Sequence, residues 1–526
     1  MRVPGLLLAL ALGCDRPPEA LPADAGTADA PPPHADWVVA IDPSGPAFAL
    51  SPALLGHYDL SGALFHYDQV PGLVAAMQSV GFAEWRVGLG RWELVTQMFR
   101  TLSDGTACDY AAPEAFLAPG TTDLDLLRAR DWFIDDGLPV DPVATGNDAR
   151  YALGYVRSVL DVAATFGAQP FVSIDEMPRA LALSRTPDRV DCRWSFRNTV
   201  SNLPPADPNL FGAAVVGVVQ RVVEGSGGEP GRPVTHWELW NEPEQPEFWD
   251  PAFDPTLDRY RAMALTTLNL LAAYRRDSIS PAAKSLRFGL GGFAQAATAV
   301  SMMQFFDAGP HPPIDFFSFH SYADDPLVTV DAIARVAAAR AASAHYRNAE
   351  LVLSEWGPDF PRGTDVVYAA SMEPALLAGT VIALGAAAGL DRAHHTFFWD
   401  FYPAPLKTRG LVDHDGQPRP IHRAYELLAG AIGMRGTARL PVAGAADGRL
   451  EGGMGALLAT RAVNGAVQVL LVNRGPAARS ARIDLRGRVA SPRRVRTFDD
   501  PTQPVRVAAG SEVVTVPPRA LVLIEL

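Results

Sequence analysis

Residues 235–243 read Thr-His-Trp-Glu-Leu-Trp-Asn-Glu-Pro, a short apolar run that ends in the carboxylate of Glu242. Residues 351–357 read Leu-Val-Leu-Ser-Glu-Trp-Gly, a second apolar run that ends in the carboxylate of Glu355. Short apolar runs bounded by Pro or Gly are typical of strands buried in a parallel sheet. Both runs therefore predict a strand that carries a glutamate at its carboxyl end.

The same pattern recurs along the chain, because short strand-like runs alternate with helical stretches from residue 53 onward. The expected strands are 53–60, 83–90, 169–177, 235–242, 286–292, 314–320, 350–356 and 393–400. The expected helices include 70–80, 149–166, 210–223, 257–276, 330–346 and 366–390. Eight strands that alternate with helices predict an α/β fold, a closed (β/α)8 TIM barrel.

The rest of the chain follows other patterns. Residues 102–146 are rich in Gly, Pro, Asp and Thr, and we expect either a cover over part of the barrel mouth or a solvated insertion. The expected organisation is an export or lipoprotein signal at 1–14, a flexible linker at 15–36, a strand segment at 37–52 that joins the β domain, the barrel at 53–432 and a small antiparallel β-sandwich at 433–526.

The amino terminus has the pattern of an export signal, a short apolar run from residue 6 to residue 12 followed by Gly13 and Cys14. The segment resembles the lipobox of bacterial lipoproteins, which implies acylation of Cys14, although Ala11 stands where that motif prefers Leu. Simple secretion is the alternative. In an oxidising compartment Cys108 and Cys192 would be left as a pair, either joined in a disulfide or present as two thiols.

Composition excludes several classes of protein. The 526 residues are 48% hydrophobic and 20% charged, so the chain can bury a large core. A net charge of −13 argues against a nucleic-acid partner. The uncharged stretch 374–390 is short for a membrane span and predicts a buried helix, which leaves a lipid anchor as the expected membrane contact.

The two glutamates predict a chemistry. Glu242 and Glu355 end the fourth and seventh expected strands, which lie on opposite sides of a barrel and aim their terminal side chains at one central pocket. Two facing carboxylates are what glycosidic bond cleavage needs. The alternative is structural, with either glutamate capping a helix or pairing with an arginine.

Four ordered motifs resemble one family of such enzymes. They are residues 237–243 followed by Phe248 and Trp249, the Ser-Glu-Trp-Gly of residues 354–357, the run Asp-Phe-Phe-Ser-Phe-His-Ser-Tyr at 315–322, and the segment from Gly410 to Ala424. Over residues 50–430 the chain resembles glycoside hydrolase family 39, of the β-xylosidase and α-L-iduronidase type, in the clan of retaining (β/α)8 glycosidases. The resemblance implies that Glu242 is the general acid/base and Glu355 the nucleophile.

The resemblance also implies several sugar-binding or positioning residues. Asn241 would hydrogen-bond the sugar 2-hydroxyl, and His320 and Tyr322 would orient the nucleophile. Arg86 would steady the charge of the nucleophile, unless it forms a buried structural pair. Trp399 would form an aromatic floor under the sugar ring, with core packing as its alternative, and Trp249 and Tyr402 are weaker candidates of that kind.

Three positions depart from the family pattern. Gly88 stands where members carry a His, Glu244 stands where they favour Asn, and Glu176 replaces a Phe, with Asp175 beside it. These changes remove a sugar contact and add negative charge, so we expect a neutral, xyloside-like β-glycoside rather than an anionic uronide.

No cofactor and no metal ion are expected, because the histidines lack metal-ligand spacing and the glycine pairs lack a nucleotide fingerprint. The expected partner is an oligosaccharide or glycoside. The protein itself is expected outside the cytoplasm, either periplasmic, anchored at the cell surface or secreted. The function expected is that of a retaining glycoside hydrolase. A noncatalytic carbohydrate-binding surface lipoprotein and a transglycosylase remain the alternatives.

Overall fold

The computed structural model describes most of the compact unit Ala35–Leu526. Described are residues 35–59, 70–81, 83–88, 160–175, 177, 181, 183, 202–226, 229–359, 362–400, 409–433 and 437–526, and the backbone of 99–101 and 108–110. Cys14, the linker, Glu176, Cys192 and Tyr402 lie outside the described residues, as does nearly all of the 102–146 segment. The anchor and the disulfide therefore stay predictions.

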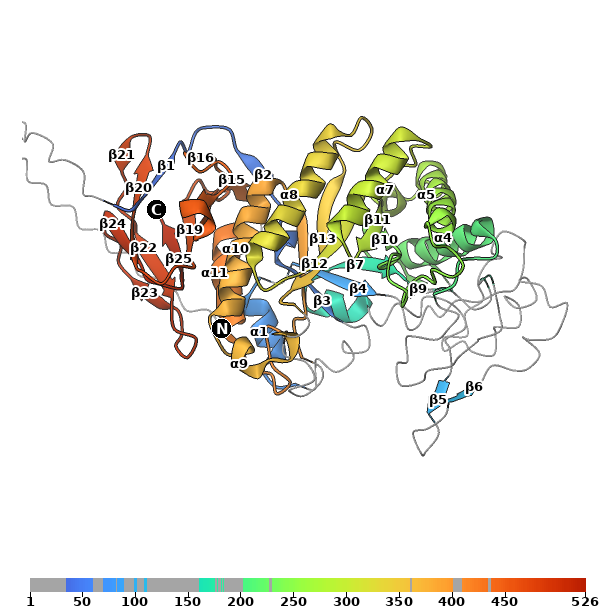
Figure 1. The fold of residues 1–526 in the computed structure, drawn as a ribbon, viewed down its shortest axis with the longest axis horizontal. Coiled ribbons are helices and arrows are strands. Elements are labelled where there is room, and N and C mark those ends of the chain that lie inside the picture. Colours follow the sequence, from blue (N-terminus) through green and yellow to red (C-terminus); the bar gives the residue numbers. More distant parts are fainter. Residues whose placement is uncertain are drawn as a thin grey trace, which may run out of the picture. The chain divides into compact units, whose positions relative to one another are not determined.

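Eight parallel strands close into a barrel, which confirms the predicted fold (Figure 1). In chain order they are β3 (Gly56–Asp59), β4 (Glu84–Gly88), β7 (Gln169–Ile174), β10 (His236–Leu239), β11 (Arg287–Phe293), β12 (Phe316–Tyr322), β13 (Glu350–Gly357) and β14 (Arg392–Thr396). Each strand lies within or beside one of the expected apolar runs. Closure comes from the pairing of β14 with β3.

The middle of the barrel is filled by side chains from alternate positions of these strands. Phe171 and Phe316 meet with their ring centroids 5.2 Å apart, and Val352 completes the cluster. Gly289 makes room for them, because a Cβ at that position would lie 2.0 Å from the ring of Phe316. The barrel is therefore a packed core and leaves open only its ends.

A charged layer lies at the amino-terminal end of the strands. Arg392 donates to Glu350 at 2.7 Å and also pairs with Glu84, which accepts a hydrogen bond from His394 at 2.9 Å if that ring nitrogen carries the proton. The attraction of Arg392 and His394 for Glu84 outweighs its burial and lowers the pKa of that carboxyl. The apolar cluster separates this charged layer from the carboxyl end of the strands.

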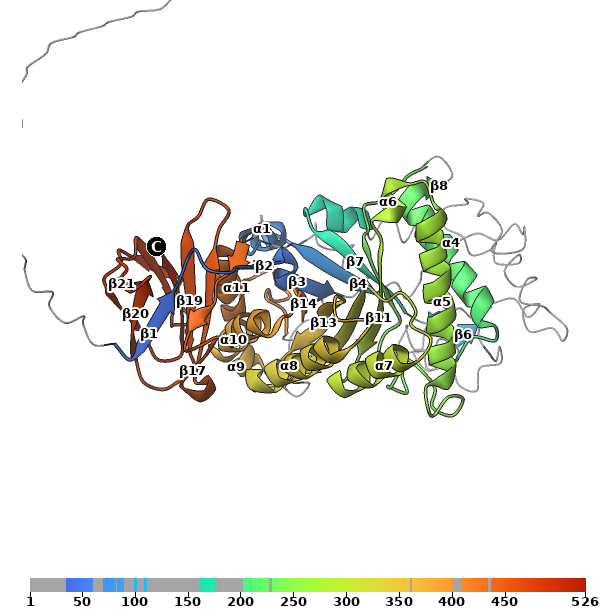
Figure 2. The same cartoon turned by 90° about the horizontal axis from the view of Figure 1, so that it is seen from above.

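Helices cover the outside of the barrel, and α10, α8 and α7 lie side by side along it (Figure 2). The helices are α1 (Leu73–Ser79), α4 (Pro208–Glu224), α5 (Asp258–Asp277), α6 (Pro281–Lys284), α7 (Ala296–Ala308), α8 (Pro326–Ala342), α9 (Val366–Ala369), α10 (Glu373–Ala388) and α11 (Pro420–Ile432), with 3-10 turns at Pro52–Leu55, Arg362–Thr364 and Glu451–Gly453. No helix among the residues described has the length and hydropathy to cross a membrane.

One expected helix is divided in the structure. The prediction of a continuous helix over 366–390 is wrong, because α9 ends at Ala369 and α10 begins at Glu373. Pro374 lies in the first turn of α10, where its missing N–H costs nothing, whereas inside a helix its ring would clash with the preceding turn. The proline therefore favours a new helix start over continuation.

The carboxyl-terminal strands, together with β1 and β2, form two facing sheets that are antiparallel except for one parallel pair, β1 with β20, and this architecture matches the expected β-sandwich. One sheet contains β1 (Trp37–Ile41), β16 (Val442–Ala443), β20 (Arg479–Leu485), β21 (Arg488–Val489) and β24 (Val513–Val516). The other contains β2 (Phe48–Leu50), β15 (Thr437–Arg439), β17 (Arg449–Leu450), β18 (Gly455–Arg461), β19 (Val467–Asn473), β22 (Arg494–Phe498), β23 (Arg506–Ala508) and β25 (Ala520–Glu525). Two short hairpins, β5 (Phe99–Thr101) with β6 (Cys108–Tyr110) and β8 (Gly225–Ser226) with β9 (Glu229–Pro230), stand apart from both.

The second sheet packs directly on α10 and α11. A Cβ on Gly379 of α10 would lie 2.6 Å from the side chain of Leu521, and a Cβ on Gly430 of α11 would lie 2.7 Å from that of Leu523. The two glycines let the helices approach the sheet closely. This face of the sheet and the barrel thereby belong to one hydrophobic cluster, whereas the space between the two sheets holds a second one.

Replacing Phe316 should show how much the central cluster stabilises the barrel. Phe316→Ala leaves a cavity among Phe171 and Val352, so we expect the free energy of unfolding to fall by about 3–5 kcal/mol in urea titrations. Phe305→Ala makes the same change on a residue that is 42% exposed and should cost far less. Equal losses in the two variants would contradict this account of the core.

Candidate active site

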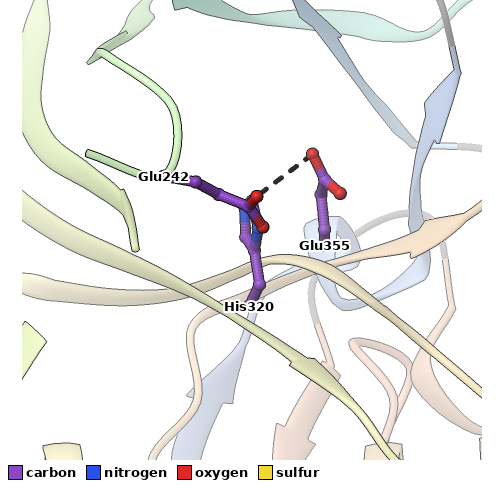
Figure 3. A group of neighbouring side chains, drawn as sticks. All are labelled: Glu242, His320 and Glu355. Carbon is purple, nitrogen blue, oxygen red and sulfur yellow. Dashed lines mark hydrogen bonds and ion pairs between the residues drawn. The ribbon is translucent and has the colours of Figure 1, made fainter. Parts of the chain in front are cut away.

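The predicted pair of glutamates meets at the carboxyl end of the barrel strands. Glu242 follows β10, Glu355 lies on β13, and His320 on β12 stands between them (Figure 3). One side-chain donor atom of each of the three residues lies within 4.8 Å of those of the other two. The structure therefore brings the side chains of these strand ends close together.

Arg86 on β4 is the centre of the site, and its side chain is 1% exposed. Its Nη1 donates to Glu355 Oε1 at 2.8 Å, its Nε donates to Glu238 Oε1 at 2.9 Å, and its Nη2 donates to Asn241 Oδ1 at 2.9 Å. Burial opposes the charge of Arg86, but the two carboxylates outweigh it and raise the pKa of the guanidinium. One cation thus holds Glu355 on β13, Glu238 on β10 and the Asn-Glu turn that follows β10.

The turn that carries Asn241 and Glu242 is strained and tightly held. Trp240 and Glu242 have φ angles of 77° and 43°, in the left-handed region of backbone conformation that residues other than glycine rarely adopt. Two backbone hydrogen bonds fix the turn, from Trp240 N to Ile174 O at 2.8 Å and from Glu242 N to Gly292 O at 2.7 Å. Strain of this kind costs about 1–3 kcal/mol per residue and is typical of functional sites.

His320 joins the two carboxylates. Its Nδ1 forms a 2.7 Å hydrogen bond with Glu242 Oε1, and its Nε2 lies 3.8 Å from Glu355 Oε1. Burial disfavours the imidazolium, but the charge of Glu355 and the hydrogen bond to Glu242 prevail and raise the pKa of His320. The imidazole can therefore share a proton with Glu242 while it attracts the charge of Glu355.

Tyr322 holds the second oxygen of Glu355. Its hydroxyl donates to Glu355 Oε2 at 2.6 Å and forms a 3.2 Å hydrogen bond with Thr396 Oγ1. Burial alone would raise the pKa of Glu355, but His320, Arg86 and Tyr322 together lower it. Glu355 is therefore kept as an anion with both of its oxygens fixed, which suits a nucleophile.

The spacing of the two glutamates has a chemical meaning. Retaining glycosidases place their two carboxyl groups about 5–5.5 Å apart, and inverting enzymes about 6.5–9.5 Å apart. One oxygen of Glu242 lies within 4.8 Å of one oxygen of Glu355, a closest approach that is compatible with the shorter spacing. The three donors are also close enough to hold a metal ion, so the expected absence of a metal stays a prediction.

Three other residues singled out from the sequence make contacts that differ from an open sugar-binding surface. Trp399 is 3% exposed, and its indole N–H donates to His414 O at 3.2 Å, so the geometry does not support an open aromatic floor. Trp249 is buried and donates to Asp254 Oδ2 at 3.0 Å. Glu244 accepts from the backbone of Gln295 at 3.0 Å, beside the start of α7, and burial raises the pKa of its carboxyl.

Sequence reasoning missed four residues that shape the site. Glu238 lies two positions after His236, whose ring packs on Phe171 and Phe316 inside the barrel, and the alternation of a strand places Glu238 on the same inward face as His236. Thr396, Tyr58 and Arg409 had no such signal, because they come from distant segments. The guanidinium of Arg86 lies 4.9 Å from the ring of Tyr58, and that of Arg409 lies 4.8 Å from the ring of Tyr322.

Comparison with known proteins supports the fold. Neither a protein-family model nor a curated protein matches the sequence. Solved structures do match, among them a glucosidase from Croceicoccus marinus, with a TM-score of 0.56 and 16% identity over 94% of this chain and 99% of that one. A family 30 endoxylanase from Clostridium papyrosolvens matches with a TM-score of 0.55 and 12% identity over 93% and 99%. A conserved exported protein from Bacteroides fragilis matches with a TM-score of 0.60 and 12% identity over 93% and 100%.

The chain has a glycosidase-like fold. The similarity extends over both the barrel and the β-sandwich, since it covers almost the whole chain. At this level of identity it shows the architecture alone. The narrower likeness to family 39 rests on the sequence motifs and stays a prediction.

Replacing Arg86 should show how much stability the protein loses when buried carboxylates have no cation. Arg86→Met leaves the carboxylates of Glu238 and Glu355 without their cation, so we expect a loss of about 3–5 kcal/mol in the free energy of unfolding. Adding Glu238→Leu to that variant removes one of the two uncompensated buried carboxylates and should restore part of the lost stability. Urea titrations of both proteins measure the difference, and a double variant less stable than Arg86→Met would contradict the ion-pair account.

Proposed function

We propose that the protein is a retaining glycoside hydrolase that cleaves a β-linked, xyloside-like glycoside. Glu355 is the nucleophile and Glu242 is the general acid/base. The observation that carries the proposal is the close pair itself, in which Glu355 is held as an anion by Arg86 and Tyr322 while Glu242 hydrogen-bonds a histidine. A carboxylate fixed for attack beside a carboxyl poised for proton transfer is the arrangement that retention requires.

In the first step an oxygen of Glu355 attacks the anomeric carbon, and the bond from that carbon to the glycosidic oxygen breaks. Glu242 gives its proton to the departing oxygen, and a glycosyl ester forms on Glu355. In the second step Glu242 takes a proton from water, the oxygen of that water attacks the anomeric carbon, and the ester bond breaks. The sugar leaves with its original anomeric configuration.

Neighbouring groups support each step. The hydrogen bond between His320 and Glu242 keeps a proton near the leaving oxygen during both transfers. Asn241 directs its Oδ1 to Arg86, so its amide nitrogen is the end that can donate to the sugar 2-hydroxyl as charge develops. The same geometry serves a transglycosylase, in which a sugar hydroxyl replaces water in the second step.

The proposal includes the finer assignments drawn from the sequence. We place the protein in glycoside hydrolase family 39 on its four ordered motifs, and we propose export with acylation at Cys14. A mass shift of the amino-terminal peptide in membrane extracts, lost in Cys14→Ser, would support acylation.

Aryl glycosides test the catalytic pair. Nitrophenyl β-xyloside and related sugars should release nitrophenol, and Glu355→Gln should lower kcat/KM by roughly 10⁴-fold or more because no nucleophile remains. Glu242→Gln should lose about 10²–10⁴-fold, and more with poor leaving groups than with good ones, since good leaving groups need little protonation. Continuous absorbance assays measure all three proteins.

Glu247→Gln is the matched control, because Glu247 is an exposed glutamate a few residues from Glu242. It should retain wild-type activity. Turnover that survives Glu355→Gln would overturn the assignment of the nucleophile. Absence of turnover with every sugar, together with retained binding of oligosaccharides, would favour the noncatalytic binding protein instead.

The pH profile tests how Glu355 is kept ionised. Activity requires its anion, so kcat/KM falls as pH drops through the pKa of Glu355, which lies below the ordinary value for Glu. Tyr322→Phe removes a hydrogen bond that lowers this pKa, so the acidic limb should move to higher pH. Tyr425→Phe changes a buried tyrosine that packs on His57 and should leave the limb in place. An unmoved limb in Tyr322→Phe would contradict the role of Tyr322.

A further inference from the structure

Helix α7 begins without a cap from its own sequence. Its N-cap residue, Gln295, makes no side-chain hydrogen bond to the first turn, and glutamine is not among the residue types that cap helices well. The acceptor comes instead from the loop after β10, because Glu244 Oε1 accepts a hydrogen bond from the backbone N of Gln295 at 3.0 Å. A carboxylate at this position also faces the positive end of the helix dipole. The side chain of Glu244 therefore caps α7.

Glu244 belongs to a tight turn that begins at Glu242. The backbone N of Gln245 donates to Glu242 O at 2.9 Å and closes this turn. Pro243 occupies the second position of the turn, where its ring fixes φ, so few free backbone torsions separate the Cα atoms of Glu242 and Glu244. A contact that restrains Glu244 therefore also restrains the backbone of Glu242.

The backbone of Glu242 needs such a restraint. Its φ of 43° is unusual for a residue other than glycine, and the proline that follows narrows its choice of conformation further. A conformation of this kind persists only where surrounding contacts hold it. The hydrogen bond from Glu242 N to Gly292 O supplies one contact, and the bond from Gln295 N to Glu244 supplies another three residues along the chain. The segment that joins β11 to α7 thus holds the turn on both sides of Pro243.

The carboxyl of Glu244 also lies close to the proposed catalytic residues. Burial raises its pKa, whereas hydrogen bonds from Thr298 and Gln295, both at the start of α7, and the charge of His320 oppose the rise. His320 is the residue that hydrogen-bonds Glu242 at 2.7 Å. The cap of α7 and the acid/base candidate are therefore neighbours in space as well as in sequence.

We propose that Glu244 is a positioning residue for the general acid/base. By capping α7 it holds the strained turn against the segment between β11 and α7, and this keeps the carboxyl of Glu242 beside His320 and within reach of the leaving oxygen. The inference deepens the proposed function and rests on it. The role belongs to the acceptor oxygen of Glu244, so Glu244→Gln, which keeps such an oxygen, should preserve it, whereas Glu244→Ala should not.

The kinetic test compares leaving groups. A displaced general acid transfers its proton poorly, so Glu244→Ala should lower kcat/KM by roughly tenfold or more for an alkyl β-xyloside, whose leaving group needs protonation. A dinitrophenyl β-xyloside departs without that proton and should lose far less. Glu244→Gln should stay within about twofold of the wild-type protein on both substrates. Glu512→Ala is the matched control on an exposed glutamate of the sandwich and should change neither value.

Two kinetic results would overturn the proposal. Equal losses on the alkyl and dinitrophenyl xylosides would mean that Glu244→Ala disturbs more than the acid/base. A loss in Glu244→Gln as large as that in Glu244→Ala would mean that the acceptor oxygen is not what matters.

Hydrogen exchange separates the positioning role from the proposed hydrolysis. Mass spectrometry of peptides that cover residues 240–250 should show exchange that is roughly tenfold faster in Glu244→Ala, and unchanged in Glu244→Gln and Glu512→Ala. Exchange that Glu244→Ala leaves unchanged would overturn the positioning role, whatever the activity. If the exchange differences appear but the wild-type protein hydrolyses no glycoside, the hydrolase proposal is overturned and the role of Glu244 in holding the turn is supported.

Discussion

The active-site geometry depends on one buried cation. The guanidinium of Arg86 is withdrawn from water, and a charge in that position is tolerated only when carboxylates and hydrogen-bond acceptors surround it. Glu238, Glu355 and Asn241 satisfy this demand from β10, β13 and the turn after β10. The constraint that stabilises Arg86 thereby fixes the catalytic candidate and the strained turn that carries Glu242.

The barrel makes this arrangement possible by separating two polar layers. At one end Arg392 binds Glu84 and Glu350, and at the other Arg86 binds Glu238 and Glu355. The apolar cluster around Phe316 lies between them and excludes water from the axis. Each layer has one partly exposed carboxylate at its outer edge, Glu350 at the amino-terminal end of the strands and Glu242 at the carboxyl end.

The sequence predicted the barrel and the glutamate pair because both leave local signals. Apolar runs of strand length recur eight times, and Glu242 and Glu355 each end such a run beside Trp and Pro or Gly. Helix α7 was not among the helices expected from the sequence. The break between α9 and α10 depends on Pro374 within a uniformly apolar stretch. Thr396 and Arg409 could not be found, because contacts between distant segments exist only after the barrel closes. The burial of Trp399 likewise depends on the segment around His414.

The central claim is that Glu355 forms a covalent bond to the sugar. A dinitrophenyl 2-deoxy-2-fluoro-β-xyloside should react once, and its sugar should remain attached to the protein. Fluorine destabilises the charged transition state, so the glycosyl ester is hydrolysed slowly and accumulates. Mass spectrometry of the digested protein should then find one added fluorosugar on the peptide that contains Glu355. A sugar attached to another carboxylate, or hydrolysis of ordinary glycosides with inverted anomeric configuration and no trapped species, would contradict the account.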